Sequence, residues 1–88
     1  MADTVAPVAE QLDALEARLA EVESYLHVDE KRARVSELEQ ASAAPGFWDD
    51  AARARATMAE LSSARDDVKA VEAAHAQLAD ARAALELA

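Results

Sequence analysis

Residues 24–50 read SYLHVDEKRARVSELEQASAAPGFWDD, and this stretch decides how the chain folds. Its charged part ends at Pro45-Gly46-Phe47-Trp48, where the only glycine, phenylalanine and tryptophan of the chain occur together. Proline disfavours helical geometry in the residue before it, and glycine permits left-handed backbone, so a helix is expected to end here. Asp49 or Asp50 is then placed to cap the next helix with its carboxylate.

Before this stretch, apolar residues recur at alternating spacings of four and three, which is the seam of a coiled coil. They are Val8, Leu12, Leu15, Leu19, Val22 and Leu26. The apolar stripe then slips, because the next apolar residues are Val28, Val35 and Leu38, whereas continuing the seam would have required apolar residues at Asp29 and Ser36. The slip amounts to two residues, which turns the apolar face by about 200°. We therefore expect a break near His27 to Asp29, with Asp29 as a candidate N-cap of a second helix.

The composition favours helices over strands. Isoleucine is absent, and the strong helix formers alanine, leucine, glutamate and arginine are abundant. The first helix is expected to begin near Thr4, whose hydroxyl can cap it. The sequence predicts an all-α fold, a three-helix antiparallel bundle in a single domain over residues 1–88, with helices at about 4–26, 29–43 and 50–87.

The third expected helix is much longer than the other two. It would reach about 55 Å, whereas a first helix of about twenty residues spans only ~30 Å. Part of it is therefore expected to lack a partner within the chain, which predicts self-association through the long third helix or a further helix after Ala88. The end at Leu85-Glu86-Leu87-Ala88, in mid-pattern and without a C-cap, favours a fragment truncated before such a helix.

Charge and composition narrow the classes of partner. The formal net charge of −9 opposes direct contact with nucleic acid or an anionic membrane. With no cysteine there is neither a disulfide framework nor a thiolate metal site. No secretory signal and no apolar run of about 20 residues is visible, so we expect a cytoplasmic protein.

No motif for catalysis or cofactor binding emerges from the sequence. Glu72-x-x-His75 has the spacing that di-iron bundles use, but those sites need a second copy of the motif, so we expect His75 to be partly exposed or to contact a neighbour. His27 is expected to make a local hydrogen bond, and Glu30 and Arg34, one turn apart, to form a helix-stabilising pair. We expect no enzyme activity, no metal and no cofactor.

The Phe47-Trp48 pair allows two interpretations. Trp48 could be an exposed anchor for a partner, because tryptophan is enriched at binding hot spots. The preferred interpretation is that Trp48 plugs the end of the helical bundle, with its indole N–H donating to a carbonyl.

The arrangement resembles the N-terminal domain of the bacterial peptide chain release factor 2 family. The similar elements run the length of the chain and end with the long helix closing on Leu85-Glu86-Leu87-Ala88. They begin with Tyr25, Leu26, Asp29 and Lys31, continue with the stripe of Val35 and Leu38, and include Pro45, Trp48 and Asp50. The chain departs from the family at Ala51-Ala52, where a proline and a glutamate are more usual.

The resemblance implies a helical domain that aids termination at UGA and UAA codons through contacts at the base of the ribosomal stalk, near the region used by the recycling GTPase release factor. The family's Gly-Gly-Gln and Ser-Pro-Phe motifs do not occur in this sequence. The resemblance therefore implies that this chain by itself neither reads a codon nor releases a peptide.

A freestanding coiled-coil or helical-hairpin adaptor is the alternative interpretation. Such an adaptor would dimerise through Leu61, Val68, Val71 and Leu78.

Overall fold

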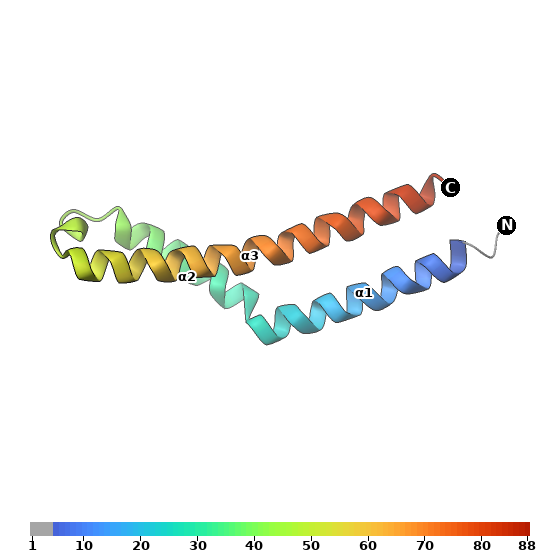
Figure 1. Ribbon diagram of the computed structural model, residues 1–88, viewed down its shortest axis with the longest axis horizontal. Helices are drawn as coiled ribbons and strands as arrows, with labels where there is room; N and C mark the ends of the chain where they lie inside the picture. The colour runs from blue at the N-terminus through green and yellow to red at the C-terminus, as the bar shows by residue number, and fades with distance from the viewer. Residues whose placement is uncertain (1–4) are drawn as a thin grey trace. The chain divides into compact units, whose positions relative to one another are not determined.

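The computed structural model describes residues 5–88 and contains three α-helices (Figure 1). They are α1 (Val5–Leu26), α2 (Val28–Ser42) and α3 (Ala51–Glu86), and a short 3-10 helix, η2 (Phe47–Asp49), precedes α3. The predicted all-α fold is confirmed. The expected Thr4 cap lies outside the described residues. Within residues 5–88, every helix is too short or too polar to cross a lipid bilayer.

The predicted break between the first two helices falls at a single residue. His27 has φ 53° and ψ 52°, a left-handed conformation that interrupts the helical path between Leu26 and Val28. His27 therefore occupies the N-cap position of α2, and it makes no side-chain cap hydrogen bond there. The prediction of Asp29 as N-cap is wrong by two residues. Asp29 lies in the first turn instead, where its negative charge suits the positive end of the helix.

The turn between α2 and α3 follows the sequence prediction closely. α2 ends at Ser42, and Gly46 adopts φ 82°, the left-handed conformation for which glycine carries no steric cost. Asp50 is extended and accepts a hydrogen bond from the Arg53 amide at 3.1 Å, so the predicted Asp50 cap is confirmed.

The chain divides into two compact units that share α3. Unit 1 comprises α1 with Ala70–Ala88, and unit 2 comprises His27–Lys69. Each part of α3 thus lies in a unit with one shorter helix. The expectation that part of the long helix lacks a partner within the chain is wrong, because α1 and α2 serve different parts of α3.

Unit 2 holds most of the buried side chains in the described part of the chain. They are Val28, Leu38, Ala54, Leu61 and Ala64. Leu61 is only 1% exposed and is the best buried large side chain. The proposed dimer seam that included Leu61 and Val71 is therefore wrong, since Val71 is also only 3% exposed within the chain.

Unit 1 is a thinner structure, an antiparallel pair of helices. Its buried residues are Leu12 and Val71. Arg82 of α3 donates to Asp13 of α1 at 2.8 Å and also pairs with Glu16. His75 contacts Glu23. The partners on α3 move towards its N-terminus as those on α1 move towards its C-terminus, so the two helices are antiparallel.

Candidate functional site

The motif that the sequence singled out forms one end of unit 2, which we call the tip (residues 44–50). The Phe47 amide donates to the Ala44 carbonyl at 3.2 Å, and the Asp49 amide donates to the Gly46 carbonyl at 3.1 Å. These bonds close two successive tight turns, so the backbone at the tip is held without a long flexible loop. The tip and the facing helices enclose an open cleft of about 590 Å³. It is lined by Arg34, Glu37, Leu38, Ala41, Ala44, Pro45, Gly46, Phe47, Asp50, Arg53 and Thr57.

Trp48 is not the plug that the sequence suggested. Its side chain is 64% exposed, whereas Phe47 is half-buried and lines the cleft. The two rings meet edge to face, with centroids 4.8 Å apart at 81°. The plug interpretation fails because unit 2 contains only two α-helices, so no third helix is present in it to cover an indole at the tip. The structure thus favours the alternative interpretation, an exposed aromatic held in a defined position by its neighbour.

Arg34 lines the cleft and forms ion pairs with two glutamates. Its guanidinium donates to both oxygens of Glu60, at 2.7 and 3.1 Å, and to Glu37 at 3.2 Å. These bonds raise the pKa of Arg34, and the bond from Arg34 lowers the pKa of Glu60 below its ordinary value of 4.5. The predicted pair of Arg34 with Glu30 is replaced by this fork, which joins α2 to α3.

Two further arginines flank the tip on the first turns of α3. Arg53 and Arg55 are both exposed, and neither guanidinium forms an ion pair with any of residues 5–88. Arg53 also lines the cleft. Tryptophan and arginine are both enriched among the hot-spot residues of protein interfaces. The tip therefore has the chemistry of a protein-contact surface, and nothing in it resembles a nucleophile with an adjacent base.

The structure places the remaining marker residues away from the tip sequence. Asp29 accepts a hydrogen bond from Arg32 at 3.1 Å in the first turn of α2. Tyr25 and Leu26 close α1 in unit 1, where Tyr25 is 83% exposed and Leu26 is half-buried. Of the six markers, only Pro45, Trp48 and Asp50 come together at the tip.

The possible metal motif is occupied by a local contact. His75 is exposed on α3 and contacts Glu23 of α1, as expected of a seam histidine with a neighbour. No cluster of three or more histidine, aspartate or glutamate side chains suited to a metal ion occurs within residues 5–88.

Sequence reasoning missed the ion pairs that join the helices. In unit 2, Lys31 pairs with Asp67, and Arg65 donates to Glu39 at 2.9 Å. A signal for the pairs in unit 1 was present, since Glu16 and Glu23 each follow a seam leucine by four residues. Such positions flank a helix seam and carry the charges that face a partner helix.

Comparison with known proteins identifies relatives over nearly the whole chain. Peptide chain release factor 2 of Salinispora tropica is 41% identical over 85 residues, which is 97% of this chain and 23% of that protein. Peptide chain release factor 2 of Mycobacterium avium is 41% identical over 75 residues, or 85% of this chain and 20% of that protein. The chain is homologous to bacterial peptide chain release factor 2. The same protein of Frankia casuarinae is 38% identical over 80 residues, covering 91% of this chain and 22% of that protein.

These relatives confirm the release factor 2 resemblance inferred from the sequence. The chain spans less than a quarter of the length of the release factors it matches. No protein-family model matches the chain, and no solved structure does.

Proposed function

We propose that the chain is the N-terminal helical region of a peptide chain release factor, which helps to position the factor on the ribosome during termination at UGA and UAA codons. The observation that carries the proposal is the identity of about 40% to release factor 2 proteins across 85–97% of the chain. Peptide release would then belong to parts of the factor that this chain does not include.

The tip is the surface we assign to ribosome contact, at the base of the stalk. Trp48 supports this assignment because its indole is 64% exposed, so it presents a large apolar area to water that a partner could cover. Arg53 and Arg55 support it because their guanidinium groups have no acidic partner within the described residues and are available to carboxylates or phosphates. The recycling GTPase release factor would be a second partner of the same region in the full-length factor.

The adaptor alternative has less support. Its dimer seam required Leu61 and Val71, and both are buried within the chain. An identity of about 40% over nearly the whole length is also more than helical periodicity alone would produce between unrelated coiled coils.

Ribosome binding tests the proposal. The 88-residue chain is expected to co-sediment with bacterial 70S ribosomes, and Trp48→Ala is expected to weaken this binding at least about tenfold, as for an interface hot spot. Tyr25→Ala is the matched control, because Tyr25 is also an exposed aromatic but lies in unit 1. Equal loss for both variants would remove the tip from the proposal, and no binding by the parent chain would remove the ribosome contact.

A chimera tests the wider claim. We expect the Salinispora tropica release factor 2, with its matching segment replaced by this chain, to release peptide at UGA and UAA codons. A chimera that folds but releases peptide no better than the factor lacking the segment would contradict membership of a working termination factor.

A further inference from the structure

The junction between α1 and α2 is a single residue in a strained conformation. His27 has φ 53° and ψ 52°, and within residues 5–88 it is the only residue other than glycine with a positive φ. This left-handed conformation is unfavourable for any residue with a Cβ atom, and glycine usually occupies it at the end of a helix. The His27 side chain is exposed and makes no cap hydrogen bond. The backbone cost at His27 is therefore compensated by packing elsewhere in the chain.

The break also leaves backbone groups without partners inside the two helices. The first bond of α2 runs from the Lys31 amide to the His27 carbonyl at 3.0 Å. The amides of residues 28–30 therefore lack acceptors within α2, and the last carbonyls of α1 lack donors within α1. In one unbroken helix these groups would bond to each other, because each amide reaches the carbonyl four residues earlier. A right-handed His27 would thus relieve the strain and complete the hydrogen bonds across the junction.

The different directions of the two buried faces keep the junction bent. Leu12 is the buried residue of α1, and Val28 and Leu38 are those of α2. At about 100° per residue, these three side chains would span roughly 160° around the axis of one unbroken helix. That is wider than the stripe of about 100° that an amphipathic helix usually buries. His27 therefore has to be left-handed only while α1 and α2 both pack on α3.

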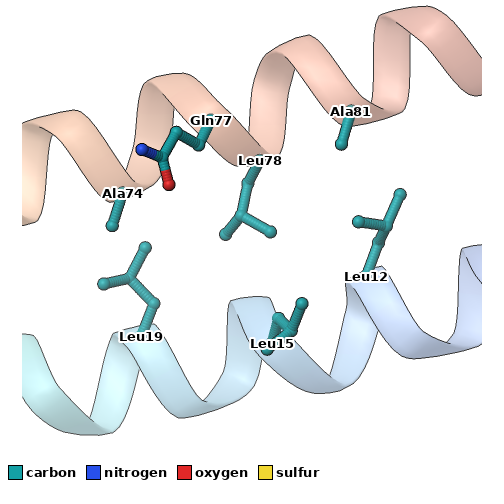
Figure 2. Close-up of a pocket in the computed structure, with 7 residues that line it drawn as sticks. All are labelled: Leu12, Leu15, Leu19, Ala74, Gln77, Leu78 and Ala81. Carbon is teal, nitrogen blue, oxygen red and sulfur yellow. The ribbon is translucent and has the colours of Figure 1, made fainter.

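The packing that holds α1 on α3 is limited. Figure 2 shows leucines of α1 pointing towards small side chains of α3, which include Ala74 and Ala81. Of the described residues in unit 1, only Leu12 and Val71 are buried, and an open apolar groove of about 300 Å³ remains between the helices. The ion pairs of this unit are partly exposed to water, so they contribute little. Unit 1 can therefore open while unit 2 keeps its core.

We infer that His27 is a conformational joint that lets α1 leave α3 without unfolding. In the bent form, α1 packs on α3 and His27 is left-handed. In the open form, His27 is right-handed and residues 5–42 form one helix, which stays attached to α3 through α2. The strain released and the hydrogen bonds completed offset part of the packing that is lost, so opening costs less than detaching a separate helix. Opening uncovers the Ala70–Ala88 part of α3.

Distances between spin labels test the joint. The chain has no cysteine, so nitroxides can be attached at Ala17→Cys on α1 and Ala79→Cys on α3, which are both exposed positions in unit 1. Pulsed electron paramagnetic resonance then separates bent chains, with a short distance between the labels, from open chains with a long one. Leu12→Ala is expected to raise the open fraction, because it truncates the buried residue of α1. The variants of the joint are compared in this background.

Two substitutions at His27 are expected to act in opposite directions. His27→Gly should lower the ratio of open to bent chains at least about fivefold, because glycine has no cost in the bent form and disfavours an unbroken helix. His27→Ala should raise this ratio about twofold, since alanine is the better helix former and is as strained as histidine in the left-handed region. Ala20→Gly is the matched control, because residue 20 is helical and exposed in α1, and it stays helical in both forms.

A second pair of labels tests the unbroken helix. Glu10→Cys on α1 and Gln40→Cys on α2 are both at exposed positions, and one helix over residues 5–42 would hold them about 45 Å apart in a narrow distribution. A break at His27 shortens this distance, and an unfolded α1 broadens it. No open chains in the Leu12→Ala background, or equal effects of His27→Gly and Ala20→Gly, would overturn the joint. Open chains with a shorter or broader distance between Glu10→Cys and Gln40→Cys would overturn the unbroken helix.

Discussion

Leu61→Ala should be the most damaging single truncation in unit 2. Leu61 is 1% exposed and is the only large side chain in residues 5–88 with less than 2% exposure. Two of the other buried residues of this unit are alanines, so few large side chains besides Leu61 contribute to its apolar core.

The magnitude follows from the atoms removed. Truncating leucine to alanine removes three carbons, worth about 2.4 kcal/mol in transfer free energy at ~0.8 kcal/mol each. A residual cavity adds to this, and a two-helix unit can partly collapse into it, so we expect a loss of about 3 kcal/mol. A chain of this length has a total free energy of unfolding of about 4–13 kcal/mol, so the variant loses a large share of its stability.

Urea unfolding followed by circular dichroism at 222 nm measures this loss. Leu87→Ala is the matched control, because Leu87 is 90% exposed and its truncation should cost less than ~0.5 kcal/mol. A loss below ~1 kcal/mol for Leu61→Ala, or a loss equal to that of Leu87→Ala, would refute the assignment of Leu61 to the core.

Glu60→Gln should make the free energy of unfolding less dependent on pH. The hydrogen bond from Arg34 lowers the pKa of Glu60, so the pair stabilises the fold above about pH 4.5. This contribution is lost as the pH falls through the lowered pKa. Urea midpoints at pH 7 and pH 3 should therefore differ less in the variant than in the parent, and an unchanged difference would contradict this role. Asp50→Ala should cost about 1 kcal/mol through loss of the α3 cap, while Asp49→Ala, its neighbour, should cost clearly less in the same urea assay. Gly46→Ala should cost about 1 kcal/mol from its left-handed backbone alone, since the added Cβ would meet Asp49 at an ordinary 3.4 Å; Gly46→Asn should cost less, and thermal melts that rank the two the other way would contradict this cause.

The features that sequence reasoning predicted well are local ones. The break near His27 was signalled by the slip of the apolar stripe at Val28, and the Asp50 cap by the residues around it. Each depends on a few neighbouring residues and on backbone preferences that the sequence states directly. The N-cap of α2 was misplaced because the left-handed conformation of His27 could not be told from the apolar pattern.

The features that it missed depend on which helices pack together. Trp48 was expected to be buried because a large aromatic usually is, but its burial required a third helix at the tip, and unit 2 has none. Arg34 was paired within its own helix because spacing alone cannot show that Glu60, 26 residues away, lies within reach. The exposure of Leu15 was not predicted for the same reason, since periodicity shows a seam but not which of its residues a partner helix covers.

The sharing of α3 between two units has a consequence for how the chain unfolds. Five of the seven buried apolar residues in the described chain belong to unit 2, and only Leu12 and Val71 belong to unit 1. The coupling between them includes the backbone hydrogen bonds that cross the Lys69–Ala70 junction inside one helix. Opening is therefore graded along α3: amide hydrogen exchange should be fast after Ala70 and slow before Lys69, within a single continuous helix. The part of α3 in unit 2 is thus more stable against local opening than the part in unit 1. A partner that binds unit 1 would first stabilise the part that opens more easily.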